Sequence, residues 1–303
     1  MEEKTVIALG FFDGVHLGHG ALLRKTAERA AELGAIPAAF TFDRSPREFV
    51  TGQTVPLLTD VEERRALIRS CYGIERTIVA PFDREMMTMS WQAFLDALLR
   101  RRYGAVHLVA GHDYRFGHRN EGTPERLAAW CAENGLGCDI IPRVEVRGIT
   151  VSSTYIRTLV EEGQMERAEE FLGHPYSLTG VVCHGQGLGS RRLFPTANLV
   201  PEANRVVPRY GVYASVAELP DGSRYPGVTN AGVRPTVSSD GGVTVETYLD
   251  GFSGDLYGKT LRVSFLSFLR GEQRFAGTDE LHRQIENDIL ASRQLFARRG
   301  REN

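Results

Sequence analysis

The stretch TVIALGFFDGVHLGHG, residues 5–20, decides the fold of the first half of the chain. Residues 5–12 form an apolar run typical of a buried strand, and a helix is expected near residues 20–33, ending at Gly34. A strand that leads through a glycine-bearing turn into a helix is typical of phosphate-binding sites, because the first helical N–H groups point at the ligand. The stretch therefore indicates an α/β domain with an anion site beyond its first strand.

Strands and helices continue to alternate through the first half. Thr59 with Glu62 predicts a capping-box start for a helix that runs to about Tyr72. Ser90 and Thr123-Pro124 mark the starts of two more helices. Further strands are expected at residues 35–42, 75–80, 105–110 and 138–142. This alternation predicts a Rossmann-like parallel sheet covered on both faces, with ligands beyond the carboxyl ends of its strands.

In the second half of the chain, the spacing of apolar residues changes to one typical of short strands. Six short strands are expected, at residues 177–184, 194–200, 211–219, 223–230, 243–250 and 261–269. Asp221-Gly222 is a hairpin-turn signal, so the pattern predicts a small antiparallel barrel of Greek-key type. A helix from about Asp279 to Phe296 should close the chain, with Thr278 as its cap and an apolar face made by Leu281, Ile285 and Ile289. We expect two domains, residues 1–175 and 176–303.

Composition narrows the class of protein. The 303 residues carry a net charge of −2 with scattered Lys and Arg, so no basic stripe suggests a nucleic-acid partner. No apolar run approaches the ~20 residues that cross a bilayer, and the start, MEEKTVIALGFF, lacks the features of a secretory signal. The four cysteines form no CxxC pair, as expected of reduced thiols. A cytoplasmic protein is predicted, and nothing in the sequence predicts an oligomer.

Two histidines follow the first strand. His16 and His19 are three residues apart and would share a face of the first helical turn, where two imidazoles can hydrogen-bond a phosphate. A pair of surface histidines beside a turn is the alternative, and a zinc site is a third, without a further ligand at suitable spacing.

Two later segments fall at the same sheet edge. Residues 111–117 read GHDYRFG after one strand, and residues 152–157 read SSTYIR after the last strand. The Ser and Thr residues of the second segment are either helix caps or, with Arg157 on the same turn, a phosphate clamp.

The second half has its own polar segments. Residues 185–198 read GQGLGSRRLFPTAN, in which Thr196 and Asn198 project from one face of an extended chain. An ordinary hairpin loop is the alternative reading of the glycines. Glu246 lies in VETYLD, residues 245–250, where an exposed strand glutamate is the alternative to a catalytic carboxylate.

The HxGH of residues 16–19, GHDYRFG and SSTYIR, in this order, resemble the adenylyltransferase module of the prokaryotic bifunctional riboflavin kinase/FAD synthetases. The resemblance implies that Asp113 and Phe116 line the flavin pocket. It also implies that ATP and its phosphates are handled by Gly10, Phe12, His16, Gly18, His19, Ser153, Thr154 and Arg157, with the two histidines and the arginine as catalytic residues. One segment departs from the family pattern, because Arg44-Ser45 stands where the family usually has Pro-His before a proline.

PTAN, together with NAGVRPT at residues 230–236, VETYLD and FLRGE at 268–272, resembles the riboflavin kinase module. The resemblance implies that Asn230 and Arg270 contact the flavin and that the nucleotide and its Mg²⁺ are held by Gly185, Gly187, Thr196 and Asn198, the last two as metal ligands. Glu246 is the expected general base, because the 5′-hydroxyl of riboflavin is neutral and must lose a proton. Leu193 replaces a glycine that the family usually has before Phe194.

The resemblance implies an enzyme that uses ATP twice, first to phosphorylate riboflavin to FMN and then to adenylylate FMN to FAD. FMN already carries an anionic nucleophile, so the second reaction needs alignment and charge neutralisation rather than a strong base. The alternatives are a riboflavin kinase with a weakened first domain, a non-catalytic flavin- or nucleotide-binding regulator, and a generic adenylyltransferase with an unrelated barrel.

Overall fold

A computed structural model of the chain describes residues 3–183, 195–201, 204–233, 243–273 and 275–302. The chain forms two compact units, residues 1–153 and 154–303. The expected functional boundary after residue 175 remains a prediction.

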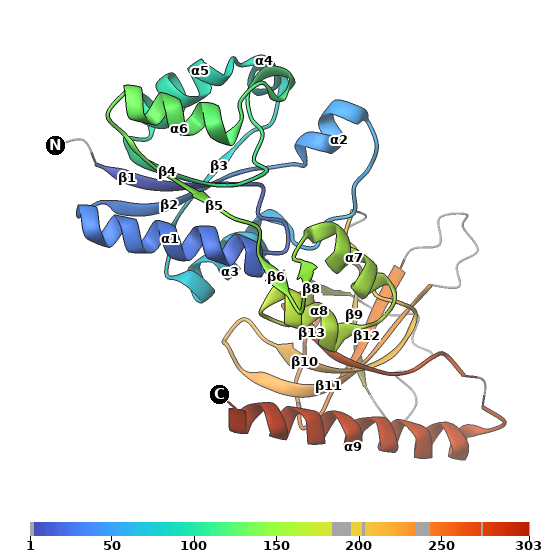
Figure 1. Ribbon diagram of the computed structural model, residues 1–303. Helices are drawn as coiled ribbons and strands as arrows, with labels where there is room; N and C mark the ends of the chain where they lie inside the picture. The colour runs from blue at the N-terminus through green and yellow to red at the C-terminus, as the bar shows by residue number, and fades with distance from the viewer. Residues whose placement is uncertain (1–2, 184–194, 202–203, 234–242, 274, 303) are drawn as a thin grey trace. The chain divides into compact units, whose positions relative to one another are not determined.

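The first unit is built on a five-stranded parallel sheet in the order β3-β2-β1-β4-β5 (Figure 1). Its strands are β1 (Thr5–Leu9), β2 (Ile36–Phe42), β3 (Arg76–Ala80), β4 (Ala105–Gly111) and β5 (Gly137–Ile141). The parallel sheet predicted from the sequence is confirmed, with each strand within a few residues of its expected range. Because β1 is central, the turn that follows it lies at the middle of the carboxyl edge.

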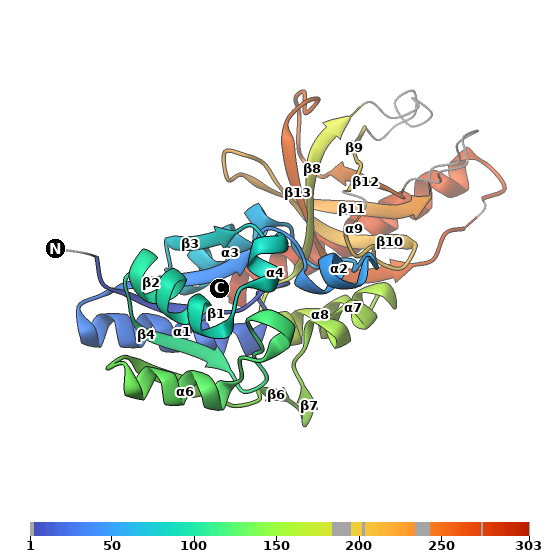
Figure 2. The same ribbon diagram turned by 90° about the horizontal axis from the view of Figure 1, so that it is seen from above.

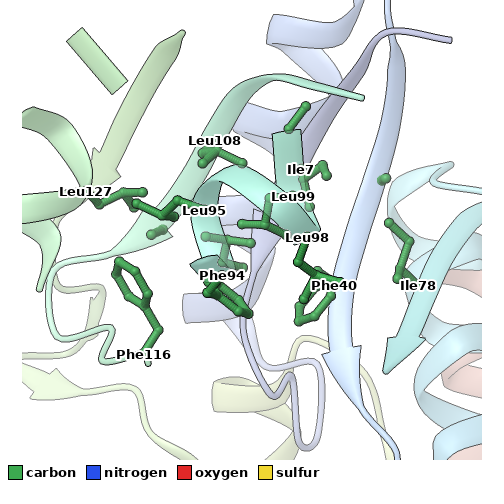
Figure 3. Packing of buried hydrophobic residues seen from close by; sticks show 14 of the residues in the cluster. Ile7, Phe40, Ile78, Phe94, Leu95, Leu98, Leu99, Leu108, Phe116 and Leu127 are labelled. Carbon is green, nitrogen blue, oxygen red and sulfur yellow. The ribbon is translucent and has the colours of Figure 1, made fainter. Parts of the chain in front are cut away.

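Helices cover both faces of this sheet. On one face lie α1 (Leu17–Leu33) and α3 (Val61–Tyr72), which pack on Val6, Ala8 and Ala39. On the other lie α4 (Arg84–Thr88), α5 (Trp91–Ala93) with the continuing π-helical turns η1 (Phe94–Arg102), and α6 (Pro124–Glu133). Figure 3 shows this second core, where Phe40 and Leu108 of the sheet meet Phe94, Leu95 and Leu127 of the helices. Alternate side chains of each strand therefore serve opposite cores.

Three smaller elements lie at the carboxyl edge of the sheet. They are α2 (Pro46–Thr51), the 3₁₀ turn η2 (His118–Asn120) and a hairpin of β6 (Glu145–Val146) and β7 (Ile149–Thr150). None of them was expected from the sequence, because each is too short to show the repeating apolar pattern by which helices and strands are recognised.

The predicted caps are partly confirmed. Ser90 and Thr123 cap their helices as expected. The capping box predicted for Thr59 and Glu62 is wrong by one residue, since Asp60 and Glu63 form it. The Thr59 hydroxyl is engaged elsewhere, because it accepts a hydrogen bond from the N–H of Gly14 at 2.9 Å.

The second unit is a closed barrel preceded by two short helices, α7 (Ser153–Glu161) and α8 (Met165–Leu172). Its strand order is β10-β11-β12-β9-β8-β13, and every pairing is antiparallel, which confirms the predicted barrel (Figure 2). The strands are β8 (Tyr176–Cys183), β9 (Thr196–Leu199), β10 (Gly211–Glu218), β11 (Arg224–Val233), β12 (Val243–Leu249) and β13 (Thr260–Arg270).

A long terminal helix, α9 (Thr278–Glu302), packs on β10 and β11. Thr278 is its first residue, not the residue before it, and the helix extends six residues beyond its expected end at Phe296. Ser292 on this helix donates to the carbonyl of Gly227 at 2.6 Å, and Ile289 is buried. The side of the helix that carries Leu281, Ile285 and Ile289 faces inward, as predicted, since none of the three is fully exposed.

Candidate active sites

The turn after β1 has an unusual backbone. Phe12 and Val15 have φ values of 57° and 41°, and Gly14 has a φ of 79°. Left-handed conformations are costly for residues with a β-carbon, so surrounding contacts must hold the turn in shape. A β-carbon added to Gly10 would lie 3.0 Å from the Phe12 ring, which explains why a glycine stands where the strand ends.

The two histidines lie together, as the sequence predicted. His16 caps α1, and its Nδ1 accepts a hydrogen bond from the N–H of His19 at 3.2 Å. The two rings stack with centroids 3.6 Å apart and an angle of 11° between their planes. Gly18 makes room for this pair, because a β-carbon there would lie 3.1 Å from the His16 ring.

The His19 ring is held in the neutral form. Burial lowers its pKa well below the ordinary value, and the charges of His16 and Arg64 lower it further. Its Nδ1 is buried without a hydrogen-bond partner among the residues that the structure describes. A buried nitrogen of this kind is satisfied when a ligand supplies the missing partner.

Asp13 fastens the turn to a neighbouring loop. Its Oδ1 accepts hydrogen bonds from the N–H groups of Leu58 and Thr59 at 2.9 and 3.0 Å, and it is 2% exposed. Ser153, predicted to contact phosphate, donates to the Asp13 carbonyl at 3.0 Å, so it lies against the same turn.

Arg64 is a buried cation beneath this turn that the sequence analysis missed. Its Nη1 donates to the Thr41 hydroxyl at 3.0 Å and to the Phe42 carbonyl at 3.1 Å, and its guanidinium lies 4.3 Å from the Phe11 ring centre. A signal was available, because Arg64 shares the buried face of α3 with Leu67 and Ile68 at helical spacing.

An apolar cleft of about 530 Å³ opens beyond the carboxyl ends of β2, β3 and β4. Phe42 and Phe82 meet edge to face in its wall with centroids 5.0 Å apart. Phe116 lines it too, but it is only 5% exposed and packs on Phe94 in the core (Figure 3). Asp113, predicted beside Phe116 at this pocket, is absent from the cleft lining and points into solvent with its side chain 82% exposed.

The departing segment Arg44-Ser45 is well defined. Ser45 is 5% exposed and caps α2 by accepting from the N–H of Glu48 at 3.3 Å. Arg44 is 61% exposed and lies 3.6 Å from Asp43. The serine therefore has a structural task here, and the arginine reaches solvent.

The other predicted phosphate residues lie in the second unit. Thr154 and Arg157 are on α7, one turn apart. Within this unit, α7 packs through Tyr155, whose ring meets Phe171 of α8 edge to face. No group of three His, Cys, Asp or Glu side chains suited to a metal ion occurs among the described residues.

The predicted kinase residues line up across three strands of the barrel. Glu246 of β12 pairs in register with Asn198 of β9 on one side and with Asn230 of β11 on the other. Val245 and Thr247 are fully buried while Glu246 is exposed, so Glu246 and its two partners point to the outer face, where Asn198 is covered to 9% exposure. Thr196, two residues from Asn198, is paired with Tyr248 on the same face.

A second cavity, of about 260 Å³, has Thr196 in its lining. Its other walls come from Leu249 at the end of β12 and from residues 252–257, including Phe252 and Tyr257. Asp250, between those two walls, is bonded by the Arg293 guanidinium of α9. The helix thus braces the loop that forms the cavity.

Arg270, predicted to contact flavin, is engaged with α9. Its Nη2 lies 2.9 Å from Asp288, and the two side chains are 15% and 5% exposed. The guanidinium also lies 5.6 Å from the Phe275 ring centre. Gly185, Gly187 and the Leu193 departure lie outside the described residues.

Comparison with known families matches both halves of the chain. A family model for FAD synthetase matches residues 1–155, and one for riboflavin kinase matches residues 172–296. A bifunctional riboflavin kinase/FMN adenylyltransferase from Pseudomonas fluorescens is 38% identical over 96% of this chain and 93% of its own length. The chain belongs to this bifunctional family. The family resemblance inferred from the motifs is thereby confirmed.

Other members of the bifunctional riboflavin kinase/FMN adenylyltransferase family agree. The one from Escherichia coli K12 is 36% identical over 97% of this chain and 94% of its own length. A solved structure from Streptococcus pneumoniae, named as a macrolide-efflux protein, has a TM-score of 0.83 and 28% identity over 97% of this chain and 95% of that one. In the described part of the present chain, no helix is long and apolar enough to span a membrane.

Proposed function

We propose that the barrel phosphorylates riboflavin with Glu246 as general base and that the first unit adenylylates the resulting FMN. Both activities are those of the bifunctional family, and ATP is the co-substrate of each. The observation that carries the assignment is the row Asn230–Glu246–Asn198, in which one exposed carboxylate stands between a half-buried and a buried amide.

In the kinase reaction, Glu246 accepts the proton of the riboflavin 5′-hydroxyl as that oxygen attacks the γ-phosphate of ATP. Thr196 and Asn198 offer a hydroxyl and an amide oxygen, neutral donors that suit Mg²⁺ because this ion keeps much of its water shell. When bound, Mg²⁺ neutralises charge on the phosphates. The cavity beginning at Thr196 gives the rest of the nucleotide a place beside these ligands.

Flavin is recognised on the other side of Glu246. Asn230 lies opposite Glu246 on the neighbouring strand β11. Arg270 is the last residue of β13, which pairs with β10. The Asp288 carboxylate fixes the Arg270 guanidinium, so the arginine is presented in one orientation. Gly185 and Gly187 are assigned to ATP by the family resemblance.

In the adenylyl-transfer reaction, the phosphate of FMN attacks the α-phosphate of ATP, and pyrophosphate leaves. His16, His19 and the N–H groups at the start of α1 hydrogen-bond the phosphates. Thr154 and Arg157 are assigned to the phosphates of ATP by the family resemblance alone. Gly10, Phe12 and Gly18 shape the turn, and Ser153 holds it through Asp13. The apolar cleft with Phe116 in its wall takes the isoalloxazine ring. Asp113 is assigned to the flavin by the family resemblance alone.

The functional division falls after residue 175, and the enzyme works in the cytoplasm on small-molecule substrates alone. The two family matches leave residues 156–171 between them, and the proposed division lies near the start of the second match. The cysteines described as free support a reducing compartment.

The experiment is incubation of the purified chain with riboflavin and Mg-ATP, with flavins separated by chromatography. FMN should form first and FAD after it. FMN that accumulates without FAD would leave a riboflavin kinase, and a chain that binds flavin but yields neither product would be a binding protein. Omitting Mg²⁺ in the presence of a chelator should stop both steps.

A further inference from the structure

The turn after β1, residues 10–15, is supported by a side chain that lies in none of the sequence motifs. Arg64 is fully buried at the first turn of α3, and its two hydrogen bonds reach the end of β2, at Thr41 and Phe42. Thr41 in turn donates its hydroxyl proton to the Phe11 carbonyl at 2.8 Å. The arginine is thus linked through one hydroxyl to the strained segment between Gly10 and Val15.

The guanidinium also contacts this segment directly, since it lies over the Phe11 ring. Arginine suits such a place because its planar, weakly hydrated group stacks on aromatic faces and keeps its charge when buried. Burying a cation is costly, so a chain that does so at the carboxyl edge, where an anionic ligand belongs, gains from the charge there.

The His16 ring stacks on the His19 ring, and the charge of Arg64 on α3 acts on the same imidazole. We propose that Arg64 is a positioning residue of the adenylyl-transfer site, which holds the turn through Thr41 and supplies a fixed positive charge beside His19. This inference rests on the proposed function of the first unit.

The arrangement divides two tasks between two residues. Arg64 provides charge that does not vary across physiological pH, and His19 provides hydrogen bonds as a neutral imidazole. The Arg64 charge is one cause of the lowered pKa of His19, after burial and His16. The site therefore keeps a constant charge while its histidine remains in one protonation state.

The test uses the full chain with Arg64→Gln, which keeps a hydrogen-bond donor but removes the charge, and Arg64→Lys, which keeps the charge. The matched control is Arg65→Gln, because Arg65 lies on the same helix, is 49% exposed and pairs with Glu62. Each variant is assayed for FAD formation from FMN against pH, and the His19 ring resonance is followed by NMR, assigned with His19→Gln. FMN formation from riboflavin in the barrel measures the folded enzyme in each sample.

In Arg64→Gln, His19 should titrate at higher pH than in the wild type, and FAD formation should fall about tenfold, with its acid limb moved to higher pH. Arg64→Lys should keep the wild-type titration and most of the rate, and Arg65→Gln should match the wild type throughout.

An unchanged His19 titration in Arg64→Gln, or a rate lost equally at every pH, would reduce Arg64 to a structural residue and overturn the inference. If Arg64→Gln does not fold, Arg64→Lys decides, because a shifted titration in that variant contradicts the role of charge. A wild-type chain that makes no FAD would contradict the proposed function instead, and the NMR titration would still measure the effect of Arg64 on His19.

Discussion

Glu246 lies directly opposite Asn198 in the antiparallel pairing of β12 with β9, with both residues on the outer face of the barrel. Cross-strand partners have β-carbons about 5 Å apart, so a carboxylate and an amide meet at one ligand. The relationship joins the proposed proton acceptor to a proposed metal-binding side chain, as transfer of a phosphoryl group to a neutral hydroxyl requires.

We expect Glu246→Gln to abolish FMN formation, by a factor of at least about 100, because the amide cannot accept the hydroxyl proton. FAD formation from supplied FMN should be unchanged, since that reaction uses the first unit. Chromatographic assays of the two half-reactions measure this. Parallel loss of both activities would contradict two separate sites.

Thr196→Ala should raise the Mg-ATP concentration that half-saturates the kinase by about tenfold, the equivalent of one lost interaction of ~1.4 kcal/mol. Thr196→Ser should recover most of the affinity because it restores the hydroxyl. The control is Thr260→Ala, an exposed threonine at the start of β13. If alanine at residue 196 binds Mg-ATP as well as the wild type, the hydroxyl is not a ligand.

Gly18→Ala should slow FAD formation by about 10- to 100-fold, because the added β-carbon presses on the His16 ring at 3.1 Å and displaces it. Gly277→Ala is the matched control, since a β-carbon there meets nothing within 4 Å. Steady-state rates from FMN and ATP measure the effect. Wild-type rates in Gly18→Ala would show that the stacked histidine geometry is not needed.

Asp288→Asn should destabilise the barrel by about 3 kcal/mol, because it leaves the Arg270 guanidinium without its buried carboxylate. It should also raise the riboflavin KM. Circular dichroism in urea follows the barrel, while fluorescence of Trp91 and Trp130, both in the first unit, should give an unchanged midpoint. A lowered tryptophan midpoint would mean that the effect is not confined to the barrel.

His19→Gln should change how the stability of the first unit varies with pH. Folding lowers the pKa of His19, chiefly through burial, so the unfolded chain binds the proton more tightly than the folded one. Stability then falls as the pH drops below the ordinary value of about 6.5 and recovers as it rises. Urea midpoints from tryptophan fluorescence at about pH 7.5 and pH 5.5 should differ less in the variant. Equal pH dependence in both proteins would mean that His19 does not contribute.

Local patterns sufficed for much of the fold. The end of α1 at Gly34, with its φ of 59°, and the start of α6 at Thr123-Pro124 follow from the residues themselves. The register of the barrel strands does not, because the pairing of Glu246 with Asn198 and with Asn230 depends on how distant segments close together.

The features that the sequence did not reveal also depend on contacts between distant residues. Thr59 was expected to begin α3, but its hydroxyl serves Gly14, 45 residues earlier in the chain. Arg64 makes its contacts with residues 22 and 23 positions away, and a helical pattern alone cannot reveal such partners. The motifs HxGH and PTAN indicated both candidate sites, whereas the contacts that support them come from tertiary structure.

The closed barrel separates the stability of its backbone from the identity of its outward side chains. Each strand of the row that carries Asn198, Glu246 and Asn230 is hydrogen-bonded on both sides, so its backbone is held independently of the outward side chains. Mutations of the outward side chains can therefore change the proposed kinase site while the scaffold stays intact.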